Sequence, residues 1–117
     1  MNELHALIER AEEFLAAAQQ LAGSGLNNAA FDDARHAAEL AGKALLLQKL
    51  GSYPQKHQIA GELTHAGLLP PELEPRTVSR VLGAFTAGRY GFTDNKGPDE
   101  VAEAIAVAQA LVAAVHQ

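Results

Sequence analysis

Apolar residues recur three and four positions apart over the first 22 residues, a spacing that places them on one face of a helix. These positions are Leu4, Leu7, Ile8, Ala11, Phe14, Leu15, Ala18, Leu21 and Ala22. We predict that this helix ends at residues 23–25, Gly-Ser-Gly, because glycine readily adopts the left-handed conformation found after helices. Asn27 or Asn28 is then expected to cap the start of a second helix.

The second predicted helix runs from about Asn28 to Leu50 and is apolar around most of its circumference. One side carries Ala30, Ala34, Ala37, Ala38, Ala41, Ala44 and Leu45, and the apolar residues away from that stripe are Phe31, Leu40, Leu46, Leu47 and Leu50. A helix with this pattern buries several faces at once, so we expect it at the centre of the fold. Pro54 restricts the residue before it, so the helix should end within residues 51–54.

Three further helices are predicted in the second half of the chain. We expect a shorter helix around Lys56–Ala66, a helix that starts at Pro75 and closes near Gly88, and a last helix over about 98–116. No stretch shows the sustained alternation that is typical of strands. The sequence therefore predicts an all-α fold, an up-and-down bundle of four or five helices that forms a single domain over residues 1–117.

Alanine supplies 24 of the 117 residues, whereas phenylalanine and tyrosine together supply six and tryptophan none. Small side chains let helices approach closely, but each buries little area, and apolar burial is worth only about 25 cal/mol per Å². We therefore expect a light core in a single chain. Because the last helix is apolar on more than one face, we predict that one face is shared with a second copy in a homodimer.

The composition excludes several classes of protein. Cysteine is absent, which excludes disulfides, thiolate metal sites and a cysteine nucleophile. The most apolar stretch, residues 101–115, contains Glu103 and Gln109 and is shorter than the roughly 20 residues that span a bilayer, so no membrane association is expected. The first residues carry acids rather than the basic start of a secretory signal, and we expect a cytoplasmic protein.

Charge is unevenly distributed along the chain, whose net charge is −5. Residues 41–96 carry seven basic against four acidic residues, a balance of +3, whereas residues 1–40 and 97–117 are both acidic. An anionic ligand should therefore seek the middle segment. The alternative is that most of these residues are ordinary surface charge.

Arg35, Glu39 and Lys43 follow one another at four-residue steps on the second predicted helix. His36 lies beside them, so all four project near one face. We interpret them first as a solvated ladder of ion pairs, each worth roughly a few tenths of a kcal/mol. The alternative is a functional polar patch.

Lys56 and His57 lie close to the predicted start of the short helix, where backbone N–H groups and a cation can meet a phosphate. The alternative is that His57 only caps or packs at this corner. His65 lies eight residues further on, which is about 12 Å along a continuous helix and too far for both imidazoles to bind one ion. No metal site is therefore predicted.

Arg76 and Arg80 lie one helical turn apart, and Arg89-Tyr90 follows at the predicted end of the same helix. Arginine holds phosphate through forked hydrogen bonds, and a neighbouring aromatic ring can stack on a base. The alternative is that Arg89 satisfies the last carbonyl groups of the helix while Tyr90 packs under the loop.

Several catalytic motifs are missing from the sequence. It has no glycine-rich phosphate loop, no G-x-S-x-G nucleophile elbow and no H-E-x-x-H metal motif. We therefore assign no catalytic residue and no cofactor, and nothing in these residues demands an enzyme.

Taken in order, these features resemble the HEPN domain, a family named for its occurrence in higher eukaryotes and prokaryotes and for nucleotide binding. The likeness covers nearly the whole chain. It comprises an apolar first helix, the pattern A-x-E-L-x-x-K-A-L-L at residues 37–46, the Lys56-His57 corner, and the Arg89-Tyr90 pair before the last helix. Each motif is weak alone, and the order and spacing together are fairly specific.

The resemblance implies a helical up-and-down bundle, a homodimer and pairing with a small nucleotidyltransferase encoded beside it, often as a toxin–antitoxin couple. Some members are RNA-cutting toxins that use an arginine followed four to six residues later by histidine. Here residues 93–95, at that distance from Arg89, are Thr, Asp and Asn, and no histidine occurs between His65 and His116. The sequence therefore departs from the ribonuclease motif.

We expect a non-catalytic HEPN-type module whose basic middle segment binds a nucleotide, an RNA phosphate or a partner nucleotidyltransferase. The predicted binding residues are Lys43, Lys56, His57, Arg76, Arg80, Arg89 and Tyr90. One alternative is a ribonuclease toxin with a degenerate site, in which Arg89 stabilises the phosphate and His57 acts as the base. Another is a purely structural dimeric adaptor.

Overall fold

Five helices make up the fold in the computed structural model, which describes residues 2–90 and 95–117 and the side chains of all of these except 85–90. The helices are α1 (Glu3–Gly23), α2 (Asn27–Leu50), α3 (Ala60–His65), α4 (Pro75–Tyr90) and α5 (Pro98–Val115). No strand occurs over the described ranges. The predicted all-α bundle is confirmed.

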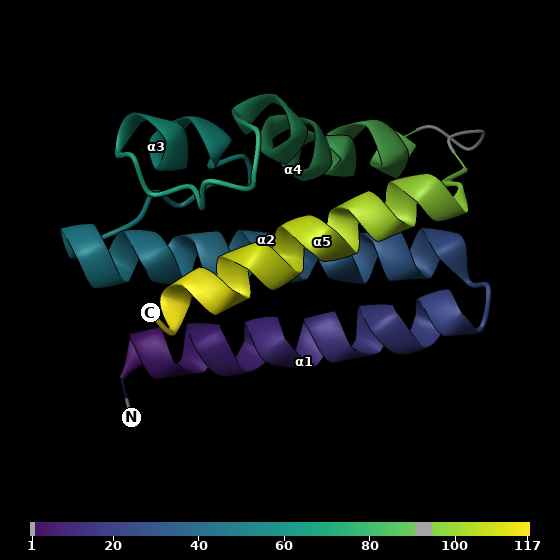
Figure 1. The fold of residues 1–117 in the computed structure, drawn as a ribbon, viewed down its shortest axis with the longest axis horizontal. Helices are drawn as coiled ribbons and strands as arrows, with labels where there is room; N and C mark the ends of the chain where they lie inside the picture. The colour runs from purple at the N-terminus through teal and green to yellow at the C-terminus, as the bar shows by residue number, and fades with distance from the viewer. Residues whose placement is uncertain (1, 91–94) are drawn as a thin grey trace.

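Helix α2 lies at the centre of the bundle (Figure 1). α1 runs antiparallel to it on one side, and α5 crosses in front of it and also contacts α1. α3 and α4 lie on the opposite side of α2 from α1. The central place predicted for this helix from its all-round apolar pattern is therefore confirmed.

The alanines of α2 form the middle of the core. Those at most 1% exposed are Ala30, Ala34, Ala37, Ala38, Ala41 and Ala44. The largest fully buried side chains are Leu46, Ile59, Leu63, Leu82, Leu111, Val78, Val81 and Val107. All of these large side chains except Leu46 come from segments around α2, and the small alanines of α2 let those segments pack closely on it.

The outward side of α5 carries small side chains rather than large apolar ones. Ala102, Ala106 and Ala113 are exposed, and the larger Val107 and Leu111 are buried. The large apolar side chains exposed within the described ranges are Leu26 and Leu50, near the two ends of α2. The homodimer stays a prediction.

The prediction of an asparagine cap on α2 is wrong. Leu26 occupies the N-cap position, and no side chain accepts a hydrogen bond there. The amide of Asn28 is used elsewhere: its Nδ2 donates to Oδ1 of Asn95 at 3.1 Å, and its Oδ1 accepts from the backbone N–H of Lys96 at 2.8 Å. Asn28 therefore fastens the segment before α5 to the start of α2.

The short helix predicted over Lys56–Ala66 forms only over Ala60–His65. The reason is the side chain of Gln58, whose Oε1 accepts from the N–H of Ala60 at 3.0 Å while its Nε2 donates to the carbonyl of Ser79 at 2.8 Å. These bonds cap the helix start and tie the chain to α4, so His57 lies in a bend ahead of α3.

None of these helices, over the residues described, combines the length and apolar character needed to cross a membrane.

Candidate functional site

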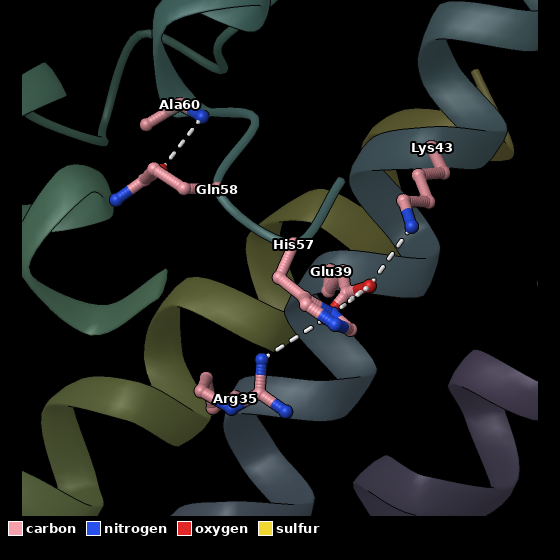
Figure 2. A network of polar contacts seen from close by, with 6 residues as sticks. All are labelled: Arg35, Glu39, Lys43, His57, Gln58 and Ala60. Carbon is pink, nitrogen blue, oxygen red and sulfur yellow. Dashed lines mark hydrogen bonds and ion pairs between the residues drawn. The ribbon is translucent and has the colours of Figure 1, made fainter. Parts of the chain in front are cut away.

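A buried group of charges lies on the face of α2 that looks toward the loop before α3. Successive four-residue steps bring Arg35, Glu39 and Lys43 onto one line of the helix (Figure 2). Nη1 of Arg35 lies 3.0 Å from Oε1 of Glu39, and Nζ of Lys43 lies 2.9 Å from Oε2. The side chains of Arg35 and Glu39 are only 5% exposed and that of Lys43 12%.

The interpretation of these residues as a solvated ladder is therefore wrong. The loop that follows α2 folds back over the helix and places His57 against the carboxylate of Glu39 (Figure 2). The ion pairs have the sequence spacing of a surface ladder but lie almost entirely out of water. We call Arg35, Glu39, Lys43 and His57 the Glu39 cluster.

Burial and hydrogen bonding act in opposite directions on Glu39. Burial alone would raise the pKa of this carboxyl group, but hydrogen bonds from Lys43 and Arg35, the charge of Lys43 and a hydrogen bond with His57 together lower it. Glu39 is therefore ionised at neutral pH and serves as a fixed anion that gathers three nitrogen-bearing side chains.

His57 is the solvent-facing part of the cluster. Its Nδ1 lies 3.2 and 3.1 Å from the two carboxylate oxygens of Glu39, and its side chain is 63% exposed. Because an ionised carboxylate only accepts hydrogen bonds, Nδ1 must carry the proton. Nε2 is then an acceptor in the neutral ring and a second donor in the protonated ring.

Tyr53 ties the cluster to the start of α1. The ring of Tyr53 lies 5.8 Å from Nζ of Lys43, within the range of a cation–π contact. Its hydroxyl donates to the carboxylate of Glu3, and this hydrogen bond is the leading cause that raises the pKa of Tyr53. Lys43 is therefore held between the Glu39 carboxylate and an aromatic ring.

His36, predicted to share this face, packs at the α1–α2 interface. Its ring stacks on Phe14 of α1, with ring centroids 4.3 Å apart and planes inclined by 12°. Burial is the leading cause that lowers the pKa of His36, so the folded chain favours the neutral ring. His36 therefore contributes to helix packing.

A family comparison decides what kind of domain holds this cluster. The sequence pattern of the HEPN domain matches residues 4–117. The chain belongs to the HEPN domain family. A search of curated proteins finds no match.

The HEPN domain brings together two of the predicted binding residues, Lys43 and His57. Lys56 turns away to an ion pair with Glu62, at 2.6 Å between Nζ and Oε2. Its side chain is 53% exposed.

The predicted residues of α4 do not join the cluster as far as their side chains are described. Arg80 forms two hydrogen bonds of 2.7 Å with the carboxylate of Glu103 on α5. Arg76 lines an open groove between α3 and α4. Arg89 and Tyr90 belong to the last turn of α4, and their side chains lie outside the described part of the structure.

Arg35 and Glu39 are missing from the predicted set of binding residues, although this HEPN domain builds its cluster around them. The sequence did hold one indication that these two residues are buried. They alternate with Ala34, Ala38 and Ala41 on a helix that is apolar on nearly every side, so charges on it were bound to be partly buried.

Within the described residues, no group of three or more His, Cys, Asp or Glu side chains could hold a metal ion. The chemistry that the Glu39 cluster offers is therefore positive charge, hydrogen-bond donors and one oriented imidazole.

Proposed function

We propose that this HEPN domain is a non-catalytic binding module and that the Glu39 cluster receives the phosphate group of a nucleotide or of RNA. The donors that the cluster gathers carry the proposal: Arg35, Lys43 and His57 all lie within 3.2 Å of the carboxylate of Glu39. A guanidinium, an ammonium and an imidazole group are therefore held together at one place on the fold. A phosphate is the kind of anion that such a site attracts.

The exposed ring of His57 is the point at which a ligand reaches these groups. Arg35 and Glu39 are 5% exposed, whereas His57 is 63% exposed. An anion that contacts His57 therefore lies close to the guanidinium of Arg35 and the ammonium of Lys43, which bind the same carboxylate. The phosphate then meets the imidazole ring of His57, and Lys43, which is bound to the same carboxylate of Glu39, adds its positive charge.

Membership of the HEPN family supports two further proposals, a homodimer and pairing with a small nucleotidyltransferase as part of a toxin–antitoxin couple in the cytoplasm. The exposed alanines of α5 leave room for a close helix contact in the dimer. Light scattering that gives the mass of two chains supports the dimer, and the mass of one chain contradicts it. Co-purification with the product of the neighbouring reading frame supports the pairing, and its failure contradicts it.

Titration with labelled mononucleotides and single-stranded RNA tests phosphate binding. We expect binding that weakens with salt, and about a tenfold loss of affinity in His57→Gln, because that variant removes a charge-assisted hydrogen bond. His5→Gln is the matched control, since His5 is exposed near the start of α1 and lies outside the cluster. Binding that is insensitive to salt, or unchanged in His57→Gln, contradicts the proposal.

A second candidate function is favoured by one observation, the contact between Glu39 and His57. A carboxylate that holds Nδ1 of a histidine leaves Nε2 as a proton acceptor, which is how a general base is oriented in many hydrolases. This candidate is the ribonuclease with a degenerate site, in which His57 takes the proton and Arg89 stabilises the phosphate.

A gel assay of RNA cleavage separates the two candidates. Cleavage that is lost in both His57→Ala and Arg89→Ala supports the ribonuclease. RNA that is bound but stays intact supports the non-catalytic module.

A further inference from the structure

A second cationic feature lies apart from the Glu39 cluster, in an open groove of about 490 Å³ between α3 and α4. The residues that line it are Ala60, Gly61, Thr64, His65, Pro75, Arg76 and Ser79. It shares no residue with the Glu39 cluster. None of its lining residues is acidic.

The guanidinium of Arg76 is the positive charge of this groove. It takes part in no ion pair with a described residue, in contrast to Arg80, which is bound to Glu103. The nearest carboxylate of α3, that of Glu62, is turned to Lys56. Arg76 is exposed and therefore available to a negatively charged group of an occupant.

The walls of the groove are held at a fixed spacing. Gln58 bonds to the first turn of α3 through the N–H of Ala60 (Figure 2). It also bonds to α4 through the carbonyl of Ser79. A partner therefore meets a surface that is already formed, which lowers the entropy lost on binding.

The shape of the groove favours a segment of a protein over a small ligand. Small-molecule pockets enclose most of their ligand, whereas this groove is open to solvent along its length. Its floor is made of small residues, and at Gly61 no atom lies within 4 Å of the place a Cβ would take. A polypeptide chain can lie close to such a floor.

We infer that the α3–α4 groove docks an acidic segment of a partner protein. A small apolar side chain of the segment packs on Gly61 and Pro75, and a neighbouring Asp or Glu meets the guanidinium of Arg76. Arginine binds a carboxylate through two parallel hydrogen bonds, and it is enriched among the residues that dominate binding energy at interfaces.

Two synthetic nine-residue peptides with the same apolar centre test the inference, one flanked by Asp and Glu and one by Asn and Gln. NMR titration of the full chain at low salt should shift the amide signals of the groove residues with the acidic peptide only. Arg76→Gln should weaken this binding about tenfold. Lys49→Gln, which removes an exposed positive charge at the end of α2, is the matched control and should leave it unchanged.

Reversing the charge of residue 76 gives a change of peptide preference that unfolding of the variant would not produce. Arg76→Glu should lose the acidic peptide and gain a peptide of the same sequence with lysine in place of the acids. Equal binding of the acidic and neutral peptides, or an Arg76→Gln variant that binds as well as the parent chain, overturns the inference. Groove shifts caused by adenosine monophosphate or inorganic phosphate, with none from the acidic peptide, also overturn it and make the groove a phosphate site.

Discussion

Replacing Glu39 with alanine tests the buried charge network most directly. The substitution leaves Arg35, 5% exposed, inside the protein without the carboxylate that its Nη1 contacts at 3.0 Å. Lys43, at 12% exposed, has a flexible stem that can carry its ammonium group to water, so Arg35 bears most of the penalty. Breaking a buried pair by removing one partner costs about 3–5 kcal/mol.

This loss is large against the roughly 5–15 kcal/mol that stabilise an ordinary domain. Urea unfolding followed by far-ultraviolet circular dichroism should therefore show a much lower midpoint for Glu39→Ala. Glu39→Gln keeps the shape and one acceptor oxygen and should lose less, about 1.5–3 kcal/mol. Replacing the three α2 charges together, in Arg35→Met/Glu39→Leu/Lys43→Met, should cost little or even stabilise the fold, because none of these three charges is then left buried.

An exposed pair on α1 provides the control. His5 and Glu9 also lie four residues apart, with 3.1 Å between Nε2 and Oε2, but their side chains are 62% and 65% exposed. Glu9→Ala should change the free energy of unfolding by less than about 0.5 kcal/mol. If Glu39→Ala costs as little as Glu9→Ala, the network behaves as a surface ladder and the reasoning from burial is refuted.

Acid pH provides a second measurement on Glu39. Its pKa is lowered in the folded chain, so its contribution to stability is present above the pKa of the unfolded chain and is lost as pH falls through the lower folded value. The parent chain should therefore lose stability over this acid range faster than Glu39→Gln does. Parallel curves would contradict the assignment of Glu39 as a buried anion.

Two further predictions concern the helices around the cluster. Burial lowers the pKa of His36, so the contribution of this residue to stability is lost as pH falls from above the pKa of the unfolded chain through that of the folded chain. His36→Phe keeps a ring against Phe14, and its unfolding midpoint should change less with pH between about pH 7 and 5 than that of the parent chain. The same pH dependence in both chains would contradict this prediction. Gly51 ends α2 with φ of 87°, so Gly51→Ala should lower the free energy of unfolding, measured by thermal unfolding, by about 1–2 kcal/mol. Gly23→Ala at the end of α1 is the control and should not destabilise the fold, because the added Cβ meets no atom there. Equal effects at the two glycines would contradict the role of φ.

The sequence was sufficient for the helices whose ends are set by local chemistry. Glycine at residues 23–25 and at Gly51, and proline at Pro75 and Pro98, mark boundaries that the structure confirms within one or two residues. The start of α3 was not predictable in this way, because it is capped by Gln58, and the position of that side chain depends on α4. Contacts between distant segments leave no local pattern.

The candidate site was predicted only in part for a related reason. Residues spaced four apart with alternating charge have the same pattern whether water or a loop covers them, so the sequence left open whether Arg35, Glu39 and Lys43 were solvated. The loop that carries His57 decides this, and it reaches α2 only in the folded chain. Arg80 differs in that the sequence predicted it to bind a ligand, whereas in the fold it is bound to Glu103, 23 residues away.

The depth of each residue in the Glu39 cluster divides it into a part that maintains the fold and a part that can meet a ligand. Arg35 and Glu39 lie under the loop and belong to α2, the helix on which α1 and α5 pack, so changes there alter stability and binding together. His57 is mostly exposed and joins the cluster through its contact with Glu39. A change at His57 leaves the buried ion pairs in place. Variants of His57 therefore test ligand binding with little effect on the stability of the fold.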